Sequence, residues 1–179
     1  MKTLQVLPLL CFSWVLVVTA EEVPIDKVTS IHVDISAVNA SGGVVPVDGV
    51  TSSGQPDEAS LQVFADSGYV AVIDMRGIEE NRGMENERAS VEAVGMEYIL
   101  FPIVGRDDIS LENARVLDGL LQDKDGPVLI HCGSGNRVGA VLALRRSLDG
   151  ASKAEAIAHG KNAGMTGLET LVRERLDED

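Results

Sequence analysis

The stretch that decides the fold runs from Val128 to Ala140 and reads VLIHCGSGNRVGA. Its first three residues are apolar and predict a buried strand, and the Val, Ala and Leu pattern from Val138 onward predicts a buried helix. A short loop with glycine at two of four positions joins them. Such an order forms an anion cradle, because backbone N–H groups and the positive end of the helix dipole point into the loop.

Two side chains of this stretch can carry chemistry. Cys132 stands at the mouth of the cradle, where positive charge favours the thiolate, which is the nucleophilic form of cysteine. Arg137 would hold an oxyanion through a planar pair of N–H donors. The backbone amides that would bind the same anion belong to Gly133, Ser134, Gly135 and Asn136. The stretch therefore predicts an active site.

Strand and helix patterns alternate along the rest of the chain. Apolar runs predict strands at Tyr69–Met75 and Glu97–Val104, and periodic segments predict helices from Pro56 to Gly68, over Glu85–Val94, from an N-cap at Ser110 to Gln122, and after capping boxes at Ser152/Glu155 and Thr166/Glu169. Short connections between alternating elements indicate the α/β class, with a mostly parallel central sheet flanked by helices.

Ligands of such sheets bind beyond the carboxyl ends of the strands. Arg76, the loop that carries Asp107 and Asp108, and Cys132 all follow predicted strands, so we expect them at one edge. Arg76 either faces the cleft and helps to bind substrate or pairs with a nearby glutamate, Glu79 or Glu80. His131 either supports the geometry of the cysteine or is a hydrogen-bonded histidine at a strand end.

The N-terminus has the pattern of a secretory signal. Lys2 precedes an apolar run, and Val18-Thr19-Ala20 has the small-residue spacing of a cleavage site. We expect a signal peptide at 1–20, a segment of unclear structure at 21–48 and one domain at 49–179. The mature protein would be exported, either periplasmic or secreted, with no membrane insertion after cleavage.

Composition excludes several partners. The formal charge of −13 argues against nucleic acid and anionic membranes. Cleavage would remove Cys11 and leave Cys132 as a lone thiol, so no internal disulfide is expected. The three histidines lack metal-ligand spacing, and neither a metal nor another cofactor is expected.

The His131-Cys132 pair, followed by Gly135 and Arg137, resembles the signature loop of the Cys-dependent protein tyrosine and dual-specificity phosphatase superfamily. The order of the surrounding motifs is similar to the bacterial phosphatase-like domain named after beta-lactamase hydrolase-like proteins. These motifs are Ser53-Gly54-Gln55-Pro56, then Val72–Arg76, then Tyr98–Pro102. The resemblance covers about residues 50 to 150 and implies a phosphatase-like fold.

The resemblance also implies roles. Cys132 would attack phosphorus, and Arg137 would hold the equatorial oxygens. Asp107 or Asp108 would protonate the leaving group and then act as base while water cleaves the phosphocysteine. The substrate would be a phosphorylated small molecule or a protein phosphotyrosine or phosphoserine. The oligomeric state stays open.

Two departures from that superfamily leave alternatives. Four residues separate Cys132 from Arg137, where the superfamily has five, and Val138 stands where a hydroxyl residue often follows the arginine. The Cys-x-x-Gly-x-Arg spacing also resembles the active loop of rhodanese-type sulfurtransferases, which carry a persulfide on the cysteine. A third interpretation is a non-catalytic module that retains the anion cradle.

Overall fold

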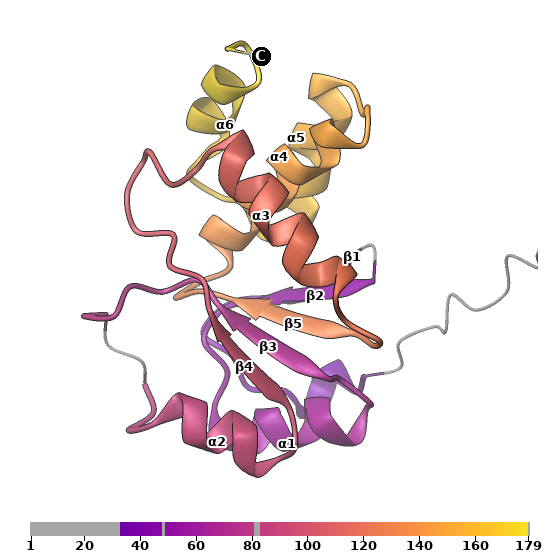
Figure 1. Cartoon of the computed structure of the whole chain (residues 1–179), viewed down its shortest axis with the longest axis vertical. Helices are drawn as coiled ribbons and strands as arrows, with labels where there is room; N and C mark the ends of the chain where they lie inside the picture. The colour runs from indigo at the N-terminus through magenta and orange to yellow at the C-terminus, as the bar shows by residue number, and fades with distance from the viewer. Residues whose placement is uncertain (1–32, 48, 81–82, 179) are drawn as a thin grey trace, which may run out of the picture.

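The computed structural model describes residues 33–47, 49–80 and 83–178, and its centre is a five-stranded sheet (Figure 1). The strands are β1 (Val44–Val47), β2 (Val50–Ser53), β3 (Ala71–Asp74), β4 (Glu97–Leu100) and β5 (Val128–His131). Their order across the sheet is β1-β2-β5-β3-β4. The β1–β2 pair is antiparallel, and the β2–β5, β5–β3 and β3–β4 pairs are parallel. The predicted mostly parallel sheet is confirmed.

Helices cover both faces of this sheet. They are the short 3-10 helix η1 (Ile35–Ala37) and α1 (Glu58–Asp66), α2 (Glu87–Ala93), α3 (Leu111–Gln122), α4 (Asn136–Leu148), α5 (Lys153–Asn162) and α6 (Glu169–Arg175). Helices α1 and α2 lie on one side, and α3 to α6 lie on the other (Figure 1). The predicted α/β class with flanking helices is therefore also confirmed.

The core consists of two apolar clusters, one on each face of the sheet. Side chains alternate along each strand, so Ile130 of β5 packs with helix α4 while its neighbour Leu129 packs with Phe64 of α1. All four residues of β5 are buried. A strand in the middle of a sheet that is covered on both faces reads as a continuous apolar run, which is why this segment was recognisable.

Two predicted helix starts are confirmed. Ser110 caps α3, with its Oγ accepting a hydrogen bond from the Asn113 N–H at 3.2 Å. Ser152 and Glu155 form the complete capping box of α5, in which each side chain accepts from the other residue's backbone N–H.

The predicted start of the first helix is wrong by two residues. Asp57, not a residue before Pro56, is the N-cap of α1, and its carboxylate accepts from the Ser60 N–H at 2.9 Å. Pro56 lies outside the helix and pairs with Ala40 in an isolated β-bridge. An aspartate at the N-cap satisfies an orphan N–H, so the helix begins after it.

The predicted capping box of the last helix is also wrong. Leu168 is the N-cap of α6 and provides no side-chain cap. Thr166 lies in the preceding turn, where its N–H donates to Asn136 Oδ1 at 2.8 Å. A hydrogen bond to Asn136, 30 residues earlier in the chain, thus replaces the predicted capping bond between Thr166 and Glu169.

A close helix contact positions α4 on the sheet. A Cβ added to Gly139 would lie 2.5 Å from the Gly160 carbonyl oxygen and 2.3 Å from the Met165 nitrogen. Helices α4 and α5 therefore approach to a distance that no larger residue allows, which fixes the start of α4, where the candidate site lies.

The chain after β4 also helps to build that site. The predicted strand Glu97–Val104 is shorter in the structure and ends at Leu100, before Pro102, which lacks an N–H for further pairing. The Ile103 N–H still donates to the Met75 carbonyl oxygen at 3.0 Å. This bond keeps the following loop beside the end of β3.

The sheet begins earlier than the predicted domain. Strand β1 at Val44–Val47 pairs with β2, so the expected boundary at residue 49 excludes one strand. The expected signal peptide at 1–20 lies outside the described residues. Within the described part of the chain, no helix has the length and apolar character that crossing a membrane requires.

Candidate active site

Cys132 lies in the loop that joins β5 to α4. The loop turns at Gly135, whose φ of 83° belongs to the left-handed region that favours glycine. This turn aims the Gly135 N–H at the sulfur, with 3.1 Å between N and Sγ. Gly135 is also the N-cap of α4, so the sulfur lies at the positive end of a 13-residue helix. The Gly135 N–H and the positive end of α4 therefore both face the sulfur.

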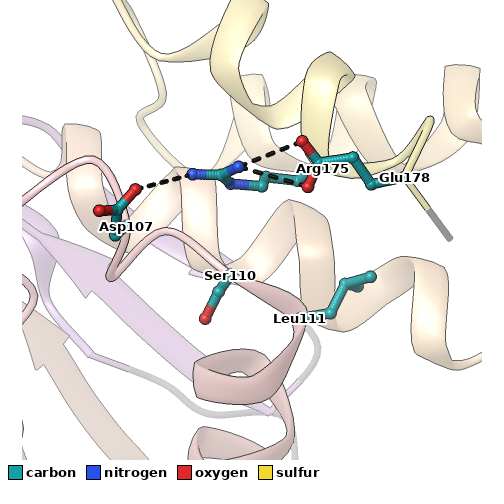
Figure 2. Close-up of a pocket in the computed structure, with 5 residues that line it drawn as sticks. All are labelled: Asp107, Ser110, Leu111, Arg175 and Glu178. Carbon is teal, nitrogen blue, oxygen red and sulfur yellow. Dashed lines mark hydrogen bonds and ion pairs between the residues drawn. The ribbon is translucent and has the colours of Figure 1, made fainter.

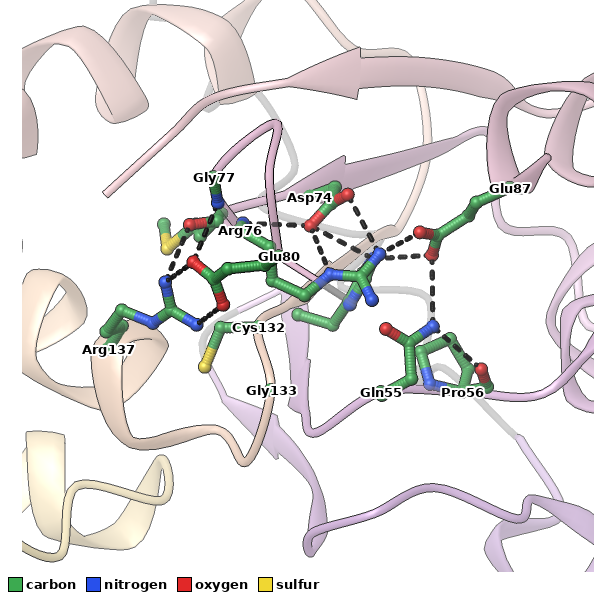
Figure 3. Close-up of polar contacts among 12 residues, drawn as sticks. Gln55, Pro56, Asp74, Arg76, Gly77, Glu80, Glu87, Cys132, Gly133 and Arg137 are labelled. Atoms are coloured by element: carbon green, nitrogen blue, oxygen red, sulfur yellow. Dashed lines mark hydrogen bonds and ion pairs between the residues drawn. The ribbon is translucent and has the colours of Figure 1, made fainter. Parts of the chain in front are cut away.

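Arg137 belongs to the first turn of α4, and its guanidinium lies near Cys132 (Figure 3). Its Nη1 donates to the Ile103 carbonyl oxygen at 2.9 Å and lies 3.5 Å from the Met75 carbonyl oxygen. The arginine thus joins the cysteine loop to the chain after β3 and β4. The hydrogen bonds with Glu80 raise the pKa of Arg137, and the Cys132 sulfur acts in the same direction.

Glu80 is a site residue that the sequence did not assign to Arg137. Its two carboxylate oxygens accept from the two terminal nitrogens of Arg137, at 2.6 and 2.7 Å. The Gly77 N–H donates to the same carboxylate at 2.8 Å. The bonds from Arg137 lower the pKa of Glu80 to about 2. The sequence offered Glu80, or its neighbour Glu79, only as an alternative partner of Arg76.

Cys132 is covered in this structure. It exposes 1% of its surface, and Glu80 with Arg137 lies above the loop in Figure 3. Arg137 and Glu80 remain partly accessible, with 21% and 35% of their side chains exposed. The ion pair beside the sulfur is therefore more accessible than the sulfur itself.

Arg76 does not lie in the cleft, which corrects the prediction that it contacts substrate. It is 1% exposed, with Nε 2.9 Å from Asp74 Oδ1 and Nη2 bonded to both Asp74 and Glu87 (Figure 3). Asp74 also accepts from the Tyr98 hydroxyl at 2.8 Å. Burial alone would raise the pKa of Asp74, but the bonds from Arg76 and the charge of His131 hold it below the usual range. Buried charges require such partners, and Glu87 was too distant in sequence to be foreseen.

His131 belongs to the same buried cluster. Its Nε2 lies 2.9 Å from Glu87 Oε1, and the side chain is fully buried. Asp74, Glu87 and His131 place one ligand atom each within 4.8 Å of one another, a spacing that suits a metal ion. The guanidinium of Arg76 already bonds to both carboxylates and supplies the positive charge there. We therefore assign this cluster to support of the strand end that precedes Cys132.

The loop residues have separate duties. The Asn136 side chain accepts from Thr166 and Gly167, at 2.8 and 3.0 Å, and so holds the turn before α6 instead of facing the sulfur. The Gly133 carbonyl oxygen accepts from Ser41 Oγ at 2.5 Å. Ser134 forms an isolated β-bridge with Gly54. The segment that the sequence left uninterpreted thus pins the cysteine loop in place.

Asp107 and Asp108, the predicted acids, are bonded elsewhere. Asp107 lies 3.3 Å from Arg175 in a surface pocket of about 330 Å³ (Figure 2). Asp108 Oδ2 accepts from the N–H groups of Val104 and Gly105, both at 2.8 Å, and these bonds lower its pKa. Within the described residues, neither aspartate bonds to Cys132 or Arg137. The structure therefore brings Cys132, Gly135 and Arg137 together and leaves both aspartates in the adjoining loop.

Comparison with known families shows to which family the chain belongs. Residues 44–149 match the family model described as beta-lactamase hydrolase-like protein, phosphatase-like domain. The chain belongs to this family. The match runs from the first residue of β1 to the residue that caps the end of α4, so it contains Cys132, Arg137 and Glu80. The family resemblance predicted from the sequence is confirmed.

Curated relatives of this phosphatase-like domain are longer proteins. A beta-lactamase hydrolase-like protein of Xylella fastidiosa is 32% identical over 120 residues, which cover 63% of this chain and 28% of that protein. One of Agrobacterium fabrum is 29% identical over 104 residues and is covered to 24%. The chain thus spans less than a third of the length of these relatives.

Solved structures share the fold of this phosphatase-like domain. A candidate phosphatase of Neisseria meningitidis is 26% identical, with a TM-score of 0.64, over 75% of this chain and 96% of that one. The active form of a protein called Tk-PTP has a TM-score of 0.56 at 24% identity, which shows the common fold alone. The domain therefore has a phosphatase fold, and Cys132 lies in the loop between β5 and α4.

Proposed function

We propose that this chain hydrolyses phosphomonoesters through a phosphocysteine intermediate on Cys132. The observation that carries the proposal is the convergence of the Gly135 N–H and the Arg137 guanidinium on the Cys132 sulfur. Phosphoryl transfer from an ester needs a nucleophile and preorganised donors for the charged oxygens, and one loop supplies both. Membership of the phosphatase-like family supports the same chemistry.

The first step forms a bond between the Cys132 sulfur and phosphorus while the ester P–O bond breaks. Arg137 and the loop amides bind the non-bridging oxygens, and the leaving oxygen takes a proton from an acid. Water then attacks phosphorus, the P–S bond breaks and the thiolate is restored. The acid, now a base, accepts the proton from water, so inorganic phosphate and an alcohol are the products.

The acid of this proposal is Asp107 or Asp108. Both belong to the loop whose Ile103 carbonyl binds Arg137, so this loop is anchored to the site even though its carboxylates bond elsewhere. Asp107 is fully exposed and held by a single bond to Arg175, which leaves it more able to move than Asp108. We favour Asp107 on this ground.

The substrate and the location are also part of the proposal. The net charge of −13 disfavours polyanionic macromolecules, so we propose a phosphorylated small molecule or a phosphotyrosine or phosphoserine side chain of a protein. The apolar run of residues 4–18 and the Val18-Thr19-Ala20 motif support export to the periplasm or the medium.

The four-residue spacing from Cys132 to Arg137 favours one second candidate, sulfur transfer by a Cys132 persulfide. The same loop would then cradle a sulfur atom rather than a phosphate. Thiosulfate and cyanide test this candidate, because Cys132-dependent thiocyanate formation would displace the phosphatase proposal.

The test compares purified wild type, Cys132→Ser and Arg137→Lys with an aryl phosphate. We expect turnover by wild type, none by Cys132→Ser above the uncatalysed rate, and a large loss for Arg137→Lys. Circular dichroism confirms that each variant is folded. Equal slow turnover by wild type and Cys132→Ser would remove the nucleophile from the proposal.

A further inference from the structure

The Glu80–Arg137 pair has the geometry of a bound substrate. Two oxygens of one planar group accept from Nη1 and Nη2 of the arginine, at 2.6 and 2.7 Å. A phosphate uses the same fork-to-fork arrangement with an arginine. The carboxylate and a substrate phosphate therefore compete for the same two donors.

Backbone groups hold both the Glu80 carboxylate and the Arg137 guanidinium in place. The Gly77 N–H holds the Glu80 carboxylate from one side, at 2.8 Å. The Ile103 carbonyl oxygen holds Arg137 Nη1 from the other, at 2.9 Å. Because the guanidinium is held by backbone as well as by Glu80, it does not depend on Glu80 alone for its orientation. Departure of the carboxylate would therefore leave Arg137 in place.

The burial of the nucleophile gives an independent indication. Cys132 exposes 1% of its surface, whereas Arg137 and Glu80 expose 21% and 35%. Attack on phosphorus needs an approach to the sulfur, and Figure 3 shows the partly exposed ion pair beside it. A partly exposed ion pair exchanges its partners more readily than a buried one, because water can solvate the group that departs.

We propose that Glu80 is a substrate-mimicking latch, whose carboxylate occupies the phosphate-binding donors of Arg137 until a substrate phosphate displaces it. The inference rests on the proposed function, since it assigns the state of that same site before substrate binds. Displacement of Glu80 both frees Arg137 and uncovers Cys132. The latch thus sets the affinity of the site for dianionic phosphate, and it excludes weaker anions that cannot compete with a carboxylate.

The test measures binding of inorganic phosphate to four forms of the full chain, wild type and three variants, each carrying Cys11→Ser so that Cys132 is the sole thiol. Glu80→Gln keeps the size of the side chain and removes its charge, and Glu79→Gln is the matched control with the same change in net charge one residue away. Glu80→Ala is a second variant that removes the latch by a different change. Calorimetry gives the affinity, and the rate of Cys132 alkylation by iodoacetamide gives the exposure of the sulfur.

We expect Glu80→Gln and Glu80→Ala to bind phosphate about tenfold more tightly, to be alkylated faster without phosphate, and to show a lower KM with kcat changed less than about twofold. Glu79→Gln should match wild type in all three measurements.

Three results would overturn the latch. A higher KM together with a lower kcat would make Glu80 a positioning residue for Arg137. A loss of kcat that grows with poorer leaving groups would make it the general acid. Affinity and alkylation equal to wild type would remove any role in access. Phosphate affinity and alkylation do not need turnover, so tighter binding in a set of inactive proteins would sustain the latch while refuting hydrolysis.

Discussion

Two arginine–carboxylate clusters lie close to Cys132, and they differ in burial. Arg76 exposes 1% of its side chain and bonds to Asp74 and Glu87, which are equally buried. Arg137 exposes 21% and bonds to Glu80, which exposes 35%. Figure 3 shows both clusters together with Cys132. A buried pair cannot exchange a partner without leaving a charge uncompensated, whereas a partly exposed pair can.

The difference in burial indicates different roles, a structural one for Arg76 and a chemical one for Arg137. Arg76 joins the end of β3 to helix α2, and it is buried, so a ligand in solvent does not reach it. Arg137 joins the cysteine loop to neighbouring loops through carbonyl oxygens and holds its carboxylate partner at the surface. Both arginines follow a parallel strand in sequence, so their positions alone did not distinguish the two roles.

Arg76→Met should give the largest effect, on stability. It leaves Asp74 and Glu87 buried without their cation, a loss we expect to cost about 3–5 kcal/mol of the free energy of unfolding. Arg106→Met is the control, because its pair with Glu174 is exposed and should contribute less than about 1 kcal/mol. Urea unfolding monitored by circular dichroism measures both. If both variants lost the same free energy of unfolding, the cluster around Arg76 would not have the stabilising role assigned to it.

Arg137→Lys should give the next effect, on catalysis. Lysine keeps the charge but loses the planar pair of donors, so kcat/KM for an aryl phosphate should fall about a hundredfold, or about 2.7 kcal/mol of transition-state stabilisation. The free energy of unfolding should change by less than about 1 kcal/mol, since the ion pair is partly exposed. A variant that retained full activity would contradict the assignment of Arg137 as the oxyanion ligand.

The pH dependence of stability tests how much the partly exposed Glu80–Arg137 pair contributes. Bonds from Arg137 lower the pKa of Glu80 from 4.5 to about 2. A folded-state pKa below the unfolded one means that this contribution is complete above pH 4.5 and is lost as the pH falls toward 2. We expect the Glu80–Arg137 pair to contribute at most about 1 kcal/mol to the free energy of unfolding, because solvent screens the pair.

Urea unfolding of wild type and Glu80→Gln at neutral pH and at about pH 3 measures this contribution. The difference between the two proteins should narrow at the lower pH, and Glu79→Gln should show no such change. A difference that did not depend on pH would mean that the Glu80 carboxylate is not held by Arg137 in solution.

The two aspartates of the following loop should give small stability effects. Asp108→Asn weakens an acceptor for two backbone N–H groups and should cost about 1 kcal/mol, as for the loss of a cap. Asp107→Asn should cost less than about 0.5 kcal/mol, because its bond to Arg175 is exposed. In the proposed mechanism, only the true acid loses more rate on substrates with poor leaving groups. If neither variant shows that dependence, the acid lies elsewhere.

Local signals made the fold and the centre of the site predictable. The buried run of β5, the glycine of the turn and the apolar start of α4 are adjacent in the chain, so they specify Cys132 and Arg137 together. The capping box at Ser152 is equally local and was confirmed. The motif order added the family, which the match over residues 44–149 confirmed.

Contacts between distant segments were not predictable from these signals. Glu80 lies 57 residues before Arg137, and Ser41 lies 92 residues before Gly133. Nothing in a sequence pattern specifies which of several acids reaches a given guanidinium. Burial of Arg76 escaped prediction for the same reason, since its partner Glu87 belongs to the next helix. The packing of segments that are distant in sequence determines these pairings.

The most direct measurement is mass spectrometry of the Cys132 peptide after rapid acid quenching of the wild-type protein with an aryl phosphate. The proposal predicts that Cys132 gains the mass of one phosphoryl group and that the adduct is absent from Cys132→Ser. A Cys132 peptide that stays unmodified during active turnover would contradict it.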